Sequence, residues 1–190
     1  MKFFSFFRKK NRGLNKSQEK GRAAKQEEPQ LPEFEEIFEV VTELLIIDPF
    51  DSSEESIIQE SELKEILLTL IVGLREHLKK VFENPSDQHK SMEQVGKYLE
   101  AAGVKPIAYT QWNQSSIQGL AARIILHGKV RTALFGHSHA LVRNTAPMRA
   151  EILEVVERAT ASGNNVYILA IDGLAYGVYE VSHRLQEIVK

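Results

Sequence analysis

Two unbroken apolar runs near the C-terminus, separated by one amphipathic segment, constrain the fold more than any other feature of the sequence. The runs lie within residues 129–136 and 165–172, and each has the length of one buried strand. Between them, Pro147 to Gly163 begins and ends as helices do, and residues 176–190 repeat a helical apolar spacing. Strands buried on both faces and joined by a helix usually pair in parallel. The sequence therefore predicts a Rossmann-like parallel βαβα unit over residues 128–190.

The chain before this unit is expected to form an acidic helical region over residues 31–127. Gly103 and Gly128 suit the ends of two of its helices. Apolar residues recur at helical spacing in residues 31–47, 52–82, 90–102 and 114–127. The predicted fold class is α/β, with an N-terminal helical region followed by a small Rossmann-like parallel βαβα unit.

Two parallel strands alone would leave both edges of the sheet open. Either residues 105–110 add a strand, or the sheet continues through self-association. We therefore expect a homo-oligomer or a protein partner.

The first 30 residues are expected to be a basic, disordered tail that contacts an anionic membrane surface. Residues 1–26 contain nine Lys and Arg residues against Glu19 alone, whereas the rest of the chain is acidic. Aromatic side chains can enter a membrane interface while neighbouring basic side chains meet anionic headgroups. The predicted contact residues are Phe3, Phe4, Phe6, Phe7, Arg8, Lys9, Lys10 and Arg12. The alternative is a solubilising tail without a membrane role.

Composition also bears on the cellular location. No apolar run approaches the roughly 18–20 residues that span a bilayer, and the N-terminus lacks the apolar stretch and cleavage site of a signal peptide. The chain has no cysteine, which excludes disulfides and thiolate metal sites and suits a reducing compartment. These features predict a cytoplasmic protein, peripheral at the inner face of a membrane. The acidic body argues against direct nucleic-acid binding.

Polar residues follow both predicted strands and form the strongest site candidate in the sequence. Because the carboxyl ends of parallel strands meet at one edge of a sheet, these residues are expected to form one rim. Backbone N–H groups at the start of a helix, together with a nearby arginine, favour an anion such as phosphate there. The predicted ligand-binding residues are Gly136, His137, Ser138, His139, Arg143, Asp172 and Gly173.

Two other interpretations of this rim stay open. His137, His139 and Asp172 could hold a metal, and Gly-His-Ser-His resembles the last Gly-His-x-His motif of calcineurin-like metallophosphoesterases. The other motifs of that family are missing, and the one Asp-x-His, Asp87-Gln88-His89, lies between two predicted helices. The sequence near the rim offers no second acid to orient both imidazoles, so neither a metal nor a cofactor is expected. The other interpretation is a purely structural turn.

A longer resemblance spans about residues 60–190. The segments "IQGLAARIILHGKVRTALFGHSHALV" and "NVYILAIDGLAYGVYEVSHRL", with a helix between them, are similar in order and spacing to one superfamily. It comprises the regulatory subunits of the guanine-nucleotide exchange complex for a translation initiation factor, methylthioribose-1-phosphate isomerases and ribose-1,5-bisphosphate isomerases. The family's Glu-x-Arg/Gln-Pro is replaced here by "AIDGLAYG", and its catalytic cysteine and aspartate belong to a later half that this chain lacks. The resemblance therefore implies a truncated or divergent member without the isomerase machinery.

The function expected from these features is that of a non-enzymatic regulatory or adaptor module. It would be peripheral to a membrane and would bind a small phosphorylated ligand at the 136–139 turn. The enzymatic alternative is a metal-dependent phosphoester hydrolase or a sugar-phosphate isomerase that uses the rim of His137, His139 and Asp172.

Overall fold

The computed structural model describes residues 33–47, 57–115, 119–142, 145 and 147–188 of the 190-residue chain. The chain divides into two compact units, Met1–Pro32 and Glu33–Lys190, and the described residues all belong to the second. Its strands are β1 (Phe34–Leu45), β2 (Tyr109–Ser115), β3 (Gly119–Leu126), β4 (Lys129–His137), β5 (Asn165–Ile171) and β6 (Leu174–Glu187). Its helices are α1 (Glu60–Val81), α2 (Asp87–Ala101), α3 (Ser138–Leu141) and α4 (Ala150–Ala161).

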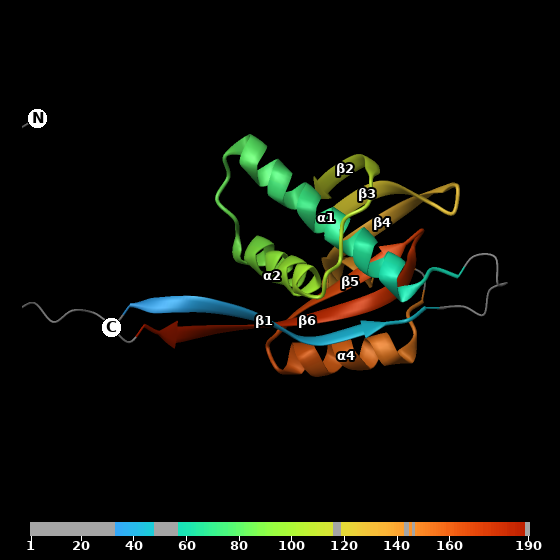
Figure 1. Ribbon diagram of the computed structural model, residues 1–190. Coiled ribbons are helices and arrows are strands. Elements are labelled where there is room, and N and C mark those ends of the chain that lie inside the picture. Colours follow the sequence, from blue (N-terminus) through green and yellow to red (C-terminus); the bar gives the residue numbers. More distant parts are fainter. Residues whose placement is uncertain (1–32, 48–56, 116–118, 143–144, 146, 189–190) are drawn as a thin grey trace, which may run out of the picture. The chain divides into compact units, whose positions relative to one another are not determined.

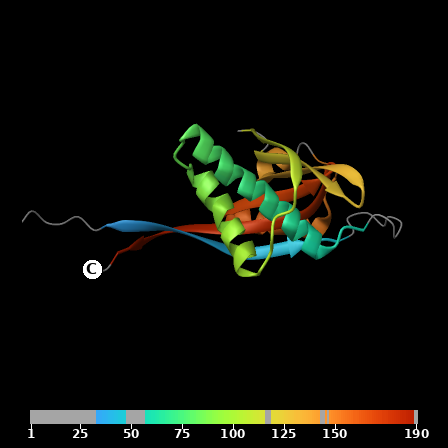
Figure 2. The same ribbon diagram turned by 45° about the horizontal axis from the view of Figure 1, so that its top comes forward.

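The six strands form one antiparallel sheet in the order β1-β6-β5-β4-β3-β2, and helices cover both of its faces (Figure 1). On one face α1 packs against β3 and β4, and α2 packs against β1 and β6. On the other face α4 packs against β5 and β6. An apolar core lies on each side of the sheet, the larger one under α1 and α2. Figure 2 shows the same layers from a second direction.

The expected parallel pairing is wrong, because every strand pair in this sheet is antiparallel. β4 and β5 are neighbours, as the sequence predicts, but Ala133 faces Ile171 and His137 faces Tyr167. Both strands are apolar throughout because α1 and α4 cover opposite faces of the sheet, and that burial does not depend on strand direction. The chain therefore has no Rossmann-like unit within its described residues.

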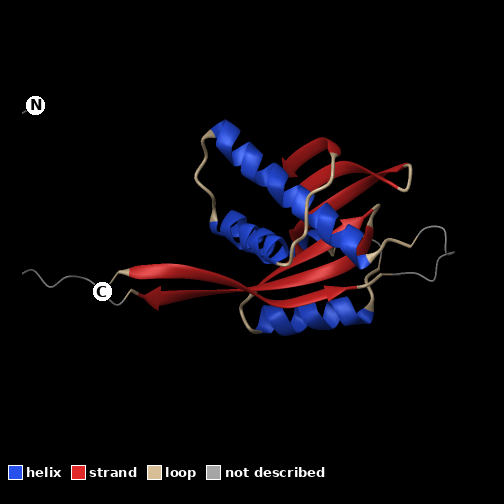
Figure 3. Cartoon of the chain, viewed as in Figure 1, coloured by secondary structure: helices blue, strands red, loops and turns tan. Residues whose placement is uncertain are grey.

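Three segments expected to be helices are strands instead. Residues 34–45 form β1, residues 119–126 form β3 and residues 174–187 form β6, as the cartoon coloured by secondary structure shows (Figure 3). Two-residue turns join β3 to β4 and β5 to β6, and both residues of each turn have a positive φ. Such turns match the right-handed twist of antiparallel hairpins. Their residues are His127-Gly128, with φ of 49° and 73°, and Asp172-Gly173, with φ of 49° and 80°.

The strands β4 and β5 and the helices α1, α2 and α4 are confirmed, with shifted ends. α1 begins at Glu60 because Gln59 and Glu62 form a capping box there, in which the Gln59 N–H donates to the Glu62 carboxylate over 2.8 Å. α2 ends before Gly103, whose φ of +81° allows the chain to leave the helix. None of the described helices is both long and apolar enough to cross a membrane.

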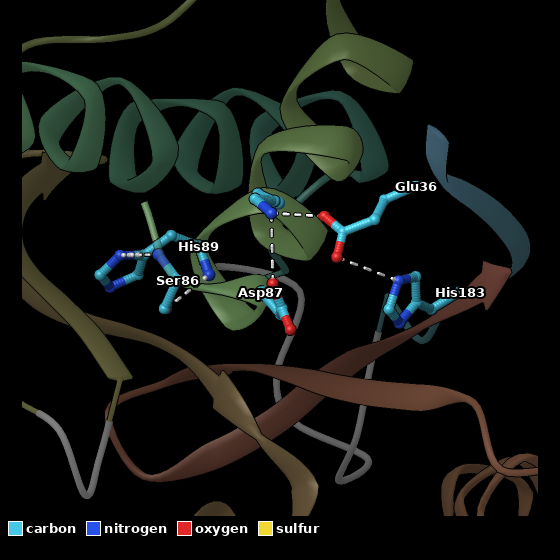
Figure 4. Close-up of polar contacts among 6 residues, drawn as sticks. Glu36, Ser86, Asp87, His89 and His183 are labelled. Carbon is cyan, nitrogen blue, oxygen red and sulfur yellow. Dashed lines mark hydrogen bonds and ion pairs between the residues drawn. The ribbon is translucent and has the colours of Figure 1, made fainter. Parts of the chain in front are cut away.

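The strands β1 and β6 run out beyond the rest of the sheet as a two-stranded arm (Figures 1 and 2). The imidazole of His183 stacks on the Phe38 ring with centroids 4.4 Å apart. Lys90 of α2 forms an ion pair with Glu36 and a second one with Asp87 (Figure 4). The Ile188 N–H donates to Glu33 O over 2.9 Å, so the two ends of the described unit lie side by side.

Candidate functional site

A pocket of about 240 Å³ lies where the start of α2 approaches the ends of β2 and β3. Its walls combine amides, hydroxyls and one imidazole with a small apolar surface. The lining residues are Glu83, Ser86, Gln88, His89, Met92, Gln114, Ser115, Gly119 and Leu120. This mixture of apolar surface with a few convergent polar groups is typical of small-molecule sites, although the volume lies below their usual range of about 300–1,000 Å³. The pocket therefore suits part of a ligand, such as a flat ring, better than a large molecule.

The helix cap at the start of α2 positions the imidazole. The His89 N–H donates to the Ser86 hydroxyl, and the Ser86 N–H donates to His89 Nδ1, both over 3.3 Å (Figure 4). The two residues thus satisfy each other's backbone N–H groups, as in a capping box. A histidine at this position is held by its own backbone and by the cap, so its ring cannot turn freely.

The cap also determines the protonation of His89. Burial lowers the pKa of His89 below its ordinary value, with a small further contribution from His77 and an opposing one from Glu83, so the ring is neutral at pH 7. Since Nδ1 accepts a hydrogen bond, the single ring proton resides on Nε2. The Gln114 side chain lies 2.7 Å from Nε2, and its amide must turn the oxygen toward that proton. The site therefore presents a neutral imidazole paired with an amide.

These groups can recognise a flat heteroaromatic ligand. The amide of Gln88 is exposed and makes no hydrogen bond within the described residues, so its donor and acceptor are both available. Met92 and Leu120 are buried and give the pocket an apolar floor. Gly119 brings the neighbouring strand close, because a Cβ at this position would lie 2.4 Å from Phe135 O and 2.6 Å from the Gly136 Cα. The pocket thus borders the start of the turn that sequence analysis singled out.

The structure separates the residues that the sequence places on one rim. His137, Ser138 and His139 lie together where β4 meets α3. Asp172 lies at the other end of β4, where its carboxylate accepts the Thr132 N–H over 2.8 Å and pairs with Arg131 over 2.9 Å. Antiparallel pairing of β4 and β5 causes this separation, so the shared rim expected for these side chains is not formed. Gly173 stays with Asp172 in the β5–β6 turn, and Arg143 lies outside the described residues.

The two histidines of the 136–139 turn contact each other. Their rings stack with centroids 4.9 Å apart, and their Nδ1 atoms are 3.1 Å apart. Burial lowers the pKa of His137, and the neighbouring His139 lowers it further. Ser138 is only 1% exposed, which places its hydroxyl away from solvent. The described residues include no cluster of three or more His, Cys, Asp or Glu side chains that could hold a metal ion.

Sequence reasoning missed the pocket because it treated His89 as an isolated histidine in a loop. A usable signal was present, since Ser86 stands three residues before His89, which is the spacing of a capping box. Gln114 and Ser115 carried no such signal, because they belong to β2, a strand that the sequence pattern places only as far as residue 110.

No protein-family model matches the sequence, and no curated protein matches it either. Two solved structures of a zinc-transporting PIB-type ATPase, each in a different phosphate-containing state, are similar to the chain with TM-scores of 0.52 and 0.53. Each is 12% identical in sequence and is matched over 78% of this chain but only 19% of its own length. A structure of the catalytic domain of the CPx-ATPase CopB-B, from work on changes upon nucleotide binding, has a TM-score of 0.42 at 12% identity, over 80% of this chain and 40% of that one.

At this identity the likeness concerns the fold alone. The chain spans about one fifth of the length of the zinc-transporting ATPases that it matches. The comparisons do not bear on the resemblance to exchange-factor regulatory subunits and sugar-phosphate isomerases, which stays a prediction.

Proposed function

We propose that this chain is a non-enzymatic regulatory module that binds an adenine nucleotide at the pocket formed by His89, Gln88 and Gln114. The observation that carries the proposal is the neutral imidazole of His89, fixed by the α2 cap and paired with an amide inside a partly apolar pocket. The solved structures with a similar fold are ATPases, which act on ATP. Since this chain spans only about one fifth of their length, we propose binding rather than turnover.

The chemistry of the pocket favours adenine among flat ligands. A glutamine amide can donate to N7 and accept from the N6 amino group of adenine with its two ends, and guanine reverses the second of these requirements. The free amide of Gln88 is available for such a pair, and the face of a neutral imidazole can stack on the base. Met92 and Leu120 would then contact the other parts of the ring.

The phosphates are assigned to the neighbouring 136–139 turn. Gly119 lies against the Gly136 backbone, so this turn begins at the border of the pocket. The phosphorylated ligand that the sequence predicts for the turn and the base that suits the pocket then belong to one molecule. In this proposal Asp172 and Gly173 take no part, because they lie at the opposite end of β4.

Isothermal titration of the full chain with ATP and GTP tests this function. We expect ATP to bind more tightly than GTP, and His89→Ala to weaken ATP binding about 5- to 150-fold, because stacking on one base contributes about 1–3 kcal/mol. The matched control is His127→Ala, since His127 lies at the far end of β3 and pairs with Glu62 over 2.7 Å. Equal binding of ATP by the His89 and His127 variants would contradict the proposal, as would the absence of ATP binding at millimolar concentration.

We also propose that the module is cytoplasmic and attaches to the inner face of a membrane through its first 12 residues, which lie outside the described residues. Support comes from four phenylalanines followed directly by a basic cluster, since each basic residue near an anionic surface contributes about 1 kcal/mol.

Co-sedimentation with vesicles tests the membrane proposal. We expect the chain to bind vesicles containing phosphatidylserine, and binding should fall when Phe3, Phe4, Phe6 and Phe7 are changed to Ser. Changing Arg8, Lys9, Lys10 and Arg12 to Gln should remove the dependence on anionic lipid and on salt. Equal sedimentation with neutral and anionic vesicles, or no loss in either variant, would rule out this attachment.

A further inference from the structure

An apolar groove of about 660 Å³ lies between the end of α1 and the start of α2. Its apolar side chains come from Leu74, Leu78, Phe82 and Pro85. Charged and polar side chains surround them, namely Arg75, Lys79, Glu83, His89, Lys90 and Glu93. The groove is therefore an apolar hollow with a rim of both charge signs, which is the arrangement of a protein–protein contact.

A protruding aromatic side chain accompanies this groove. Phe82 is 95% exposed, although it also lines the groove. It caps α1 in the left-handed conformation, with φ of 52° and ψ of 34°. Glycine or asparagine normally takes this position, and a bulky residue is strained there by an amount on the order of 1 kcal/mol. In the single chain neither the strain nor the exposure of the ring is offset by burial.

The rim offers one cation and one anion without a partner in the described part of the chain. Arg75 is held by Glu93 and Glu100, and Lys90 is held by Glu36 and Asp87. The side chains of Lys79 and Glu83, by contrast, form no ion pair or hydrogen bond within the described residues. They stand four residues apart, on either side of Phe82 along the chain. One surface thus carries a protrusion, a hollow and two opposite free charges.

We infer that this surface binds a second copy of the chain in a two-fold symmetric dimer, with Phe82 of each copy seated in the groove of the other. A two-fold contact uses the same patch on both copies, so the patch must complement itself. The protrusion beside the hollow meets this requirement, and Lys79 of one copy would face Glu83 of the other. A different partner would need only the hollow, and the acidic residues Glu83 and Glu93 make an anionic membrane an unfavourable occupant.

Sedimentation velocity of the full chain, without nucleotide, tests the dimer independently of the proposed function. We expect a species of about twice the 21.5 kDa chain mass and at least a tenfold weaker association in Phe82→Asn. Asparagine suits the left-handed backbone, so this variant should keep the thermal midpoint of the parent chain. Val130→Asn is the matched control, because Val130 is 65% exposed on β4, outside the groove, and its loss should leave association unchanged.

Charge reversal identifies the symmetric contact. Lys79→Glu and Glu83→Lys should each weaken association, because each creates two like-charge contacts per dimer, and the double variant should restore it. A chain that is monomeric at every concentration would overturn the inference and would assign the groove to a different protein. A dimer insensitive to Phe82→Asn, or a double variant no better than the single ones, would overturn it equally.

Discussion

Replacing Gly119 by alanine should lower the free energy of unfolding by about 3–5 kcal/mol, which is a large share of the roughly 5–15 kcal/mol that stabilises a domain. Two effects add. The residue has a φ of +90°, which alanine adopts only with strain of about 1–3 kcal/mol. The new Cβ would also lie 2.4 Å from Phe135 O and 2.6 Å from the Gly136 Cα, and backbone atoms of a central strand pair cannot move aside. Thermal unfolding should show a midpoint lower by roughly 10–15 °C.

The control for this prediction is Gly128→Ala in the β3–β4 turn. Gly128 also has a positive φ, of +73°, but an added Cβ there meets nothing within 4 Å. It should therefore show the backbone strain alone and a clearly smaller loss. Equal losses in the two variants would mean that the contact between Gly119 and β4 contributes nothing to stability.

The sequence pattern predicts β4 and β5 well because both strands are apolar along their whole length. It does not predict their direction, because burial on both faces depends on what covers the sheet and not on which way a strand runs. A helix between two strands favours the parallel arrangement in general. Here α4 and the short α3 lie between β4 and β5, and the chain nevertheless returns antiparallel.

The strand β6 shows why periodicity alone can mislead. Val178 and Val181 have helical spacing, but Tyr179 and Glu180 between them are buried as well. A continuous buried run fits a central strand better than one face of a helix. The Asp172-Gly173 pair at its start is a strong hairpin signal between two apolar runs, and it outweighs the weak helical spacing that follows.

The candidate pocket could be predicted only in part. The capping spacing of Ser86 and His89 is visible in the sequence and fixes the imidazole at the start of α2. The meeting of His89 with Gln114 depends on the β2–β3 hairpin lying beside that helix, and no local pattern encodes this contact. Residues 25 positions apart meet there because the sheet brings them together, so only the tertiary structure reveals the pair.

Replacing Gly73 by alanine should displace Trp112 and lower stability by about 2–4 kcal/mol, although alanine is the better helix former. Gly73 lies in α1 directly under the indole, where a Cβ would be 2.2 Å from Trp112 Nε1. The gain in helix propensity is about 1 kcal/mol. The loss includes much of the indole packing, about 3–5 kcal/mol when a buried Trp is removed, and the 2.9 Å hydrogen bond from Nε1 to Leu70 O. The packing loss is the larger quantity, so the midpoint should fall by roughly 5–15 °C.

Fluorescence gives this prediction a direct measurement, because Trp112 is the only tryptophan of the chain. Its emission maximum should shift to longer wavelength in Gly73→Ala, since the displaced indole meets water. Gly96→Ala is the matched control: its added Cβ meets the side chains of Ile71 and Arg75, which can give way, and it does not touch the indole. That variant should keep the emission of the parent chain. An unshifted spectrum in Gly73→Ala, combined with a raised midpoint, would show that α1 and β2 move apart without losing the indole contact and that helix propensity is the larger effect.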